Sequence, residues 1–144
     1  MASINEQITA RLAALLTGTT AAGVNVYRSR EIPVTRQVSP AIVVRPDADS
    51  VERFAQNVNL HRFAVLVEVF TRGDPADTLA EPIDTAAAKL ITTDATLLGL
   101  VASVFAGVPA WESDEADRTA GCLTRTYEFV YLANARDPAS PPNS

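Results

Sequence analysis

The sequence predicts a single α+β domain, in which a mixed or antiparallel β-sheet carries an N-terminal helix and a long central helix on one side. Two stretches indicate the sheet, because β-branched and aromatic residues dominate 60–72 and 123–133 in an alternating pattern. Two other stretches, 3–16 and 75–91, repeat apolar residues at helical spacing. Helix, strands, helix and strands follow one another along the chain, an order that suits helices packed on one face of a sheet.

Size and composition set the first limits. The chain has 144 residues, 47% of them hydrophobic, and a domain of that length buries about 70% of its unfolded surface. The formal net charge of −5 argues against general nucleic-acid binding, which needs a basic face. A single cysteine, Cys122, allows no intrachain disulfide. The first residues do not read as a signal peptide and no apolar run could span a bilayer, so we expect a cytoplasmic protein.

The first half of the chain begins with a short amphipathic helix. Ser3 and Glu6 form a capping box, and Gly18 is placed to follow the last turn. A short strand is expected at 24–27 and a central strand at 40–44, followed by a turn at 46–49. Residues 51–56 then form one strand of a hairpin that turns at 57–59. The next strand, 60–72, is the strongest, and one of its faces holds His61, Phe63, Val65, Val67 and Val69.

The central helix is predicted from Pro75 to residue 91, with Asp74 as its N-cap. Its apolar stripe consists of Leu79, Ile83, Ala86, Ala87, Leu90 and Ile91. Pro82 lies past the first turn, so we expect it to kink the helix or split off the first turns. The helix should break at 92–94, where Asp94 caps a further turn over 95–100.

The last part of the chain contains two strands and a tail. Residues 104–111 form a strand whose Gly107 and Pro109 indicate a bulge or an edge position. Residues 123–133 form the second strong strand, with Leu123, Tyr127, Phe129 and Tyr131 on one face. The domain is expected to span 1–135, because the Pro- and Ser-rich residues 136–144 have the composition of a disordered tail.

The sequence carries no catalytic or cofactor-binding signature. Glycine-rich nucleotide motifs, a nucleophile elbow, zinc-ligand spacings and a calcium loop are all missing, so we expect no enzyme activity, no cofactor and no metal. His61 is expected to be a solvent-exposed or rim residue, and Cys122 a packed or partly exposed thiol. Residues 72–74 spell the adhesion tripeptide Arg-Gly-Asp, but a glycine turn and an aspartate cap explain it locally.

Two charged segments are the candidate functional residues. Arg28, Arg30 and Arg36 concentrate positive charge, whereas Glu112, Asp114, Glu115 and Asp117 concentrate negative charge beside Trp111, the only tryptophan. Each segment could be a solvated loop. They could instead be complementary patches on opposite sides of a subunit, and unlike patches that meet head to tail generate rings. Trp111 could be a core or rim anchor, or a binding hot spot.

Several stretches, read in order, resemble the tail terminator proteins (minor tail protein U type) of long-tailed, lambda-like bacteriophages. The resemblance is one of order and spacing and spans about residues 4–131. It rests on the N-terminal helix and on Val-Tyr-Arg at 26–28, Ser-Pro-Ala-Ile-Val-Val at 39–44, Val-Leu-Val-Glu-Val-Phe at 65–70, Asp-Pro-Ala-Asp at 74–77 with Leu79, Trp-Glu-Ser-Asp-Glu-Ala-Asp at 111–117 and Leu-Thr-Arg-Thr-Tyr at 123–127.

The resemblance implies a structural virion protein, assembled in the host cytoplasm, that forms a hexameric ring. The ring would cap the last ring of tail-tube protein, stop tube polymerisation and offer a face to the neck or head connector. It would also meet the sheath protein if the tail contracts. On this interpretation no membrane or specific nucleic-acid sequence is bound, Arg28, Arg30, Glu31 and Arg36 belong to one contact surface, and Trp111, Glu112, Asp114 and Glu115 belong to the other.

Two alternatives stay open on the sequence. The first is a head-completion or neck connector protein of similar size, which co-purification with capsids rather than tail tubes would reveal. The second is a small ligand-binding or enzymatic α+β domain. That function needs a concave pocket with convergent polar groups, and the sequence shows no set of residues to fill one.

Overall fold

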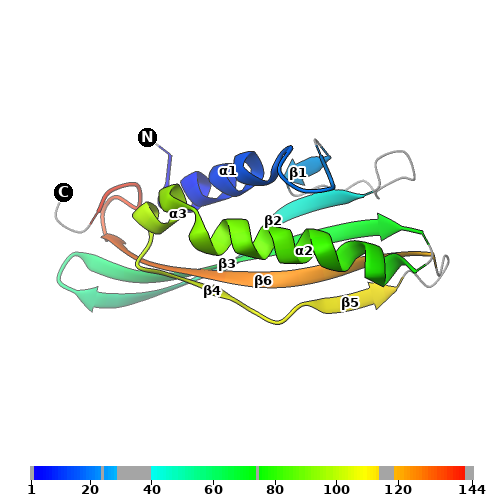
Figure 1. The fold of residues 1–144 in the computed structure, drawn as a ribbon. Coiled ribbons are helices and arrows are strands. Elements are labelled where there is room, and N and C mark those ends of the chain that lie inside the picture. Colours follow the sequence, from blue (N-terminus) through cyan, green and yellow to red (C-terminus); the bar gives the residue numbers. More distant parts are fainter. Residues whose placement is uncertain (1, 24, 29–39, 74, 114–118, 142–144) are drawn as a thin grey trace.

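The computed structural model of the chain describes residues 2–23, 25–28, 40–73, 75–113 and 119–141. Within these residues the chain is a single α+β domain with three helices and a mixed sheet of six strands, which confirms the predicted fold class. The helices lie over one face of the sheet (Figure 1). The elements are α1 (Ile4–Leu16), β1 (Val26–Arg28), β2 (Ala41–Ala55), β3 (Val58–Arg72), α2 (Ala76–Thr93), α3 (Ala95–Leu100), β4 (Ser103–Ala106), β5 (Ala110–Ser113) and β6 (Ala120–Asn134).

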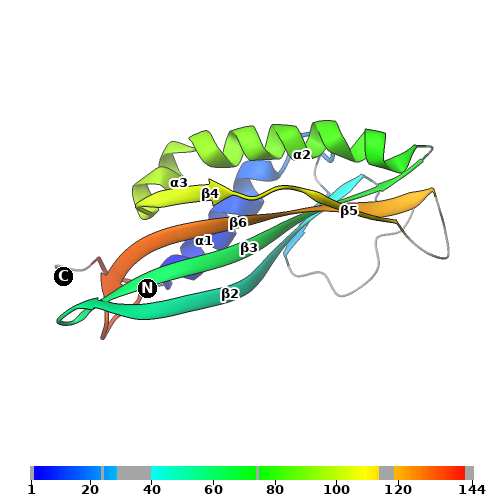
Figure 2. The ribbon, with the colours of Figure 1, turned by 90° about the horizontal axis from the view of Figure 1, so that it is seen from below.

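Three long strands form the centre of the sheet. The strand order is β1-β2-β3-β6-β4, and β5 also pairs with β6. The pairing of β1 with β2 is parallel, and all the other pairings are antiparallel. The predicted single strand at 104–111 is two short strands, β4 and β5, which follow one another along the outer edge of β6, so the edge position is confirmed and the strand is interrupted at residues 107–109. Figure 2 shows this arrangement from below, with β2, β3 and β6 in front of α1.

Strand β2 is three times as long as the predicted strand at 40–44, because the expected turn at 46–49 does not form. The chain continues in β2 through a register irregularity between Pro46 and Ala48. The neighbouring strand β1 ends at Arg28, opposite Val44, so Pro46 lies where β2 is an edge strand. An edge position tolerates proline, because its missing N–H interrupts no hydrogen bond to a neighbour. The predicted hairpin closes at residues 56–57, where Asn57 has a φ of 61°.

The core lies between the helices and one face of the sheet. The predicted inner faces of both strong strands are confirmed, since Phe63, Val65, Tyr127 and Phe129 are buried. From the helices, the largest contributions come from the fully buried Ile8, Leu12, Leu16, Ile91 and Leu97. Leu79 does not belong to the buried stripe of α2, because 49% of it is exposed and Ala76 and Ala80 face the sheet instead.

The helix ends follow the predicted capping residues. The Ser3 hydroxyl accepts a hydrogen bond from the Glu6 amide, and Gly18 adopts the positive φ of 75° expected after the last turn of α1. Asp94 ends α2 and caps α3 by accepting from the Leu97 amide. The Asp74 cap lies outside the described residues. Helix α2 is not split at Pro82, which is exposed, so the carbonyl group that the proline leaves without a partner can face water.

Residues 136–141, assigned to a disordered tail by their composition, form a turn that packs back on the domain. The Ile4 amide donates to the Pro138 carbonyl, and the Ala135 amide donates to the Asn57 carbonyl. Asp137 holds the turn together, because its side chain accepts from the Ala139 amide and the Ser140 hydroxyl. The segment therefore contacts the start of α1, and Ala135, just before it, contacts the hairpin turn; residues 142–144 lie outside the description.

Candidate functional site

His61 is buried, so the prediction of a solvent-exposed or rim histidine is wrong. Only 7% of the residue is accessible, its Nδ1 lies 3.0 Å from Asp49 Oδ2, and its ring stacks on Tyr131 with 4.6 Å between centroids. Asn5 completes a network, since its Nδ2 donates to Asp49 Oδ2 at 2.9 Å and its Oδ1 accepts from the Tyr131 hydroxyl. The extra length of β2 brings Asp49 beside this histidine, two residues from Val51, which is the register partner of His61. These residues tie α1 to β2, β3 and β6.

The predicted basic surface is represented among the described residues by Arg28 alone, because Arg30, Glu31 and Arg36 lie outside them. Arg28 is the last residue of β1, and its guanidinium forms two hydrogen bonds with the Glu6 carboxylate, at 2.8 and 2.7 Å. Both side chains are about half exposed, and this contact lowers the pKa of Glu6. The charge of Arg28 is thus matched within the same chain, by a residue of α1.

The predicted acidic surface is represented by Trp111 and Glu112 in β5, whereas Asp114 and Glu115 lie outside the described residues. Trp111 is partly buried against the core, and its indole N–H donates to the Ser113 hydroxyl at 3.0 Å. Its ring lies directly over Gly121, where an added Cβ would stand 2.3 Å from a ring carbon. Glu112 is exposed. Trp111 is therefore a half-buried anchor at the edge of the sheet.

The described members of the two predicted surfaces do not lie together, because Arg28 and the Trp111–Glu112 pair are at opposite edges of one sheet. The register connects them in rows, and one row reads Val26, Ile42, Val69, Leu123 and Trp111. Strands β1 and β5 therefore lie at the same height along the long strands, both toward the end remote from the hairpin turn (Figure 1). Arg28, on the β1 edge, and Glu112, on the β5 edge, lie a few register rows apart along the long strands.

A buried ion pair under α2 is the main feature that the sequence analysis missed. Arg125 lies on the inner face of β6, and its Nη2 donates to Asp84 Oδ2 at 2.7 Å. Its Nη1 donates to the Gly107 carbonyl at 2.8 Å, which holds the connection between β4 and β5 against β6. Both residues interrupt apolar patterns, Asp84 in the stripe of α2 and Arg125 between Leu123 and Tyr127. The sequence signal that could have indicated this pair is the presence of opposite charges at two positions whose neighbours in the pattern are apolar.

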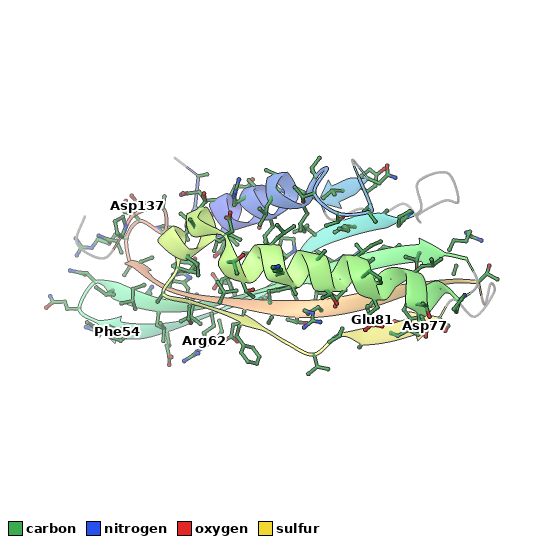
Figure 3. All side chains as sticks on the ribbon, in the orientation of Figure 1. Phe54, Arg62, Asp77, Glu81 and Asp137 are labelled. Atoms are coloured by element: carbon green, nitrogen blue, oxygen red, sulfur yellow. The ribbon has the colours of Figure 1, made fainter. Side chains whose placement is uncertain are left out.

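The sheet face opposite the helices exposes apolar side chains beside matched charges. Phe105 is 68% exposed and shares this face with its partner in β6, Glu128. Arg62 lies 3.7 Å from Glu128 and 3.9 Å from Glu52, and Phe54 is 62% exposed near the hairpin turn (Figure 3). Aromatic side chains and arginine are enriched at contacts between proteins, so this face is a candidate contact surface.

The comparisons with known proteins add no identity: no protein-family model matches the chain, and no curated protein matches its sequence. Among the described residues, no group of three or more His, Cys, Asp and Glu side chains is arranged to hold a metal ion. None of the helices in the described ranges is long and apolar enough to cross a membrane.

Proposed function

We propose that this protein is a structural subunit of a phage tail, which forms a closed ring and acts as a tail terminator. The observation that carries the proposal is the position of β1 and β5 at the same height on opposite, unlike edges of the sheet. A subunit with two different lateral edges joins its copies head to tail, and such contacts close into a ring when the rotation allows it. The resemblance to the terminator family supports the place of that ring on a tail tube.

The two edges differ in their chemistry. The β1 edge presents the ion pair of Arg28 and Glu6, while the β5 edge presents Trp111 and Glu112. Trp is enriched at the energetic centres of interfaces, and charges around it set orientation and partner choice more than affinity. This difference favours contacts between unlike edges over pairs of like edges.

The ring acts by surface complementarity. One face sits on the last ring of tail-tube protein and blocks further polymerisation, and the opposite face receives the neck or head connector. A sheath protein would bind at the same level in a contractile tail. The partners are therefore further copies of this chain, the tube protein and the connector.

The test is the native mass of the purified protein, measured alone and after mixing with its tail tubes, with negative-stain images of both. We expect a ring of about six copies, or a monomer that forms a ring only at tube ends. Binding to capsids and not to tubes would favour the head-completion alternative. A monomer that ignores both tubes and capsids would contradict the proposal.

A further inference from the structure

We infer that the β-sheet continues from one subunit to the next, because β4 of one copy pairs with the free edge of β2 in its neighbour. This inference rests on the proposed ring and names the strands that join it. It concerns a contact next to the predicted surfaces, closer to the hairpin turn. The partner is a second copy of this chain in the same orientation.

Both strands have an unpaired side within the part of the chain that the structure describes. Strand β4 is the last strand in the order β1-β2-β3-β6-β4. Strand β1 covers β2 only as far as Val44, so the stretch from Pro46 to Ala55 has β3 on one side and no strand on the other. Open edges of this kind present backbone N–H and C=O groups to another chain.

The two open edges lie at the same height in the sheet. The register assigns each residue of β4 to a row that ends at the exposed part of β2. The four rows are Ser103–Val130–Arg62–Ser50, Val104–Phe129–Phe63–Asp49, Phe105–Glu128–Ala64–Ala48 and Ala106–Tyr127–Val65–Pro46. Copies that stand side by side in a ring, with their sheets level, therefore bring β4 directly against the open part of β2.

Strand direction supports the same pairing. Strand β4 is antiparallel to β6, and β6 and β2 are both antiparallel to β3, so β4 and β2 run in opposite directions. Two copies in the same orientation then join through an antiparallel ladder, which is the more stable kind per residue. The same placement puts β5 of one copy beside β1 of the next, so the two contacts are continuous.

Side chains on the two edges also fit. Phe105 is 68% exposed, and its row ends at Ala48, whose small side chain leaves room for a neighbouring ring. Strand β4 contains no charge and no proline, the usual devices that protect an edge. On β2 such protection consists of Pro46, the bulge before Ala48 and the charged residues Asp47, Asp49, Glu52 and Arg53, but Ala48 and Ser50, which lie on the same sheet face as Phe105, are small and uncharged. We therefore place the ladder between Ser103–Phe105 and Ala48–Ser50.

Disulfide trapping tests this pairing. Ser50→Cys and Ser103→Cys are combined in a Cys122→Ser background, since both serines are exposed and end the same row. Within one chain they lie three strand spacings apart, about 14 Å, whereas a disulfide needs Cα atoms within about 7 Å. Under mild oxidation, with tubes added if the ring needs them, we expect disulfide-linked oligomers of increasing size, the largest of which has as many copies as the ring.

Matched controls separate the outcomes. Phe54→Cys with Ser103→Cys moves one thiol about 13 Å along β2 and should link at least about tenfold more slowly. Each single cysteine should leave the chains unlinked, and dimers from a single variant would show that like edges pair. Phe105→Glu should abolish the ring, whereas Leu98→Glu, on the exposed side of α3, should keep it. A ring of native mass without the 50–103 link overturns this inference alone, and no ring at all overturns the proposed function too.

Discussion

Arg125 and Asp84 form an ion pair that is largely withdrawn from water, with 18% of the Arg125 side chain still exposed. Asp84 is 1% exposed, and both Nε and Nη2 of Arg125 donate to its carboxylate, at 3.2 and 2.7 Å from Oδ2. The hydroxyl of Tyr127 lies in the same region, is buried without a hydrogen-bond partner among the described residues, and has its pKa raised by burial. The pair fixes the position of α2 on β6 and, through the Gly107 carbonyl, the position of the β4–β5 edge.

Asp84→Ala should destabilise the domain strongly, by about 3–5 kcal/mol, because it leaves the guanidinium of Arg125 buried without a counter-charge. Chemical denaturation followed by circular dichroism measures the free energy of unfolding. The double variant Asp84→Leu with Arg125→Met should recover most of the loss, since an apolar pair of similar volume removes both charges. A loss below about 1 kcal/mol in the single variant would contradict a buried pair.

Gly121→Ala should displace Trp111 from the sheet edge. Its Cβ would lie 2.3 Å from the indole ring and 2.8 Å from the Glu112 carbonyl oxygen, so β5 must shift. We expect a red-shifted tryptophan emission, a loss of about 1–3 kcal/mol as for other overpacked sites, and weaker ring formation. Gly99→Ala is the matched control, because nothing lies within 4 Å of its Cβ and alanine favours the helix.

Cys122 should react slowly with thiol reagents. Burial raises the pKa of its thiol to about 11, and only the thiolate is the nucleophile. At pH 8 the alkylation rate should be about 200-fold below that of a free cysteine with a pKa of about 8.5, and should rise about tenfold per pH unit up to pH 10. Alkylation by iodoacetamide, followed by mass spectrometry, measures the rate. The unfolded chain in guanidinium should react at the ordinary rate, and equal rates in the folded chain would disprove the prediction.

The contact between Arg11 and Asp94 should make stability depend on acid pH. The guanidinium of Arg11 lowers the pKa of Asp94, at Nη2–Oδ1 and Nε–Oδ2 distances of 2.7 and 2.9 Å. A carboxyl whose pKa is lower in the folded state stabilises above its unfolded pKa of about 3.9, and this contribution is lost as the pH falls through the folded value. Asp94→Asn keeps an N-cap and should cost about 1 kcal/mol at pH 7.

The free energies of unfolding of the wild type and Asp94→Asn should converge between pH 4 and pH 2. Denaturation curves at each pH test this convergence. Glu6→Gln is the control, because the pKa of Glu6 is also lowered but its carboxylate is solvent-exposed in the pair with Arg28. Surface pairs of that kind contribute little. A constant gap between wild type and Asp94→Asn over the whole acid range would rule out the ionic contribution.

Formation of the proposed ring should depend on Arg28 only if its guanidinium makes an electrostatic contact with the neighbouring subunit. Arg28→Glu breaks the pair with Glu6, and the exchange of both residues, Arg28→Glu with Glu6→Arg, restores an ion pair within the subunit. If the β1 edge is an interface, the exchanged variant should fold like the wild type yet form rings less readily. Native mass and circular dichroism of the two variants measure this, and unchanged rings in both would remove Arg28 from the interface.

Local signals in the sequence were sufficient for most of the fold. Ser3, Gly18 and Asp94 mark the helix ends through contacts within a few residues, and alternation marks the inner faces of β3 and β6. The course of β2 depends instead on tertiary context. A proline followed by aspartate favours a turn, and only the end of β1 opposite Val44 makes Pro46 an edge residue that a strand can hold.

The candidate site was less accessible from sequence. The segments that hold Arg28 and Trp111 could be recognised from composition, but their placement at one height on opposite edges follows from strand order and register. The same is true of His61, whose side chain is buried between Asp49 of β2 and the Tyr131 ring of β6. Long-range pairing of this kind leaves little trace in a single sequence.

The pairing of β3 with β6 has a consequence for how the chain folds. The β2–β3 hairpin turns at residues 56–57, so it closes a short loop and can form early. Its partner β6 starts only after α2, α3, β4 and β5 have been synthesised, and Val58 pairs with Asn134 near the end of the chain. Such non-local contacts form slowly. Until β6 inserts, the nascent hairpin exposes the long apolar strand β3, and during that interval the chain is most at risk of aggregation and has most need of a chaperone.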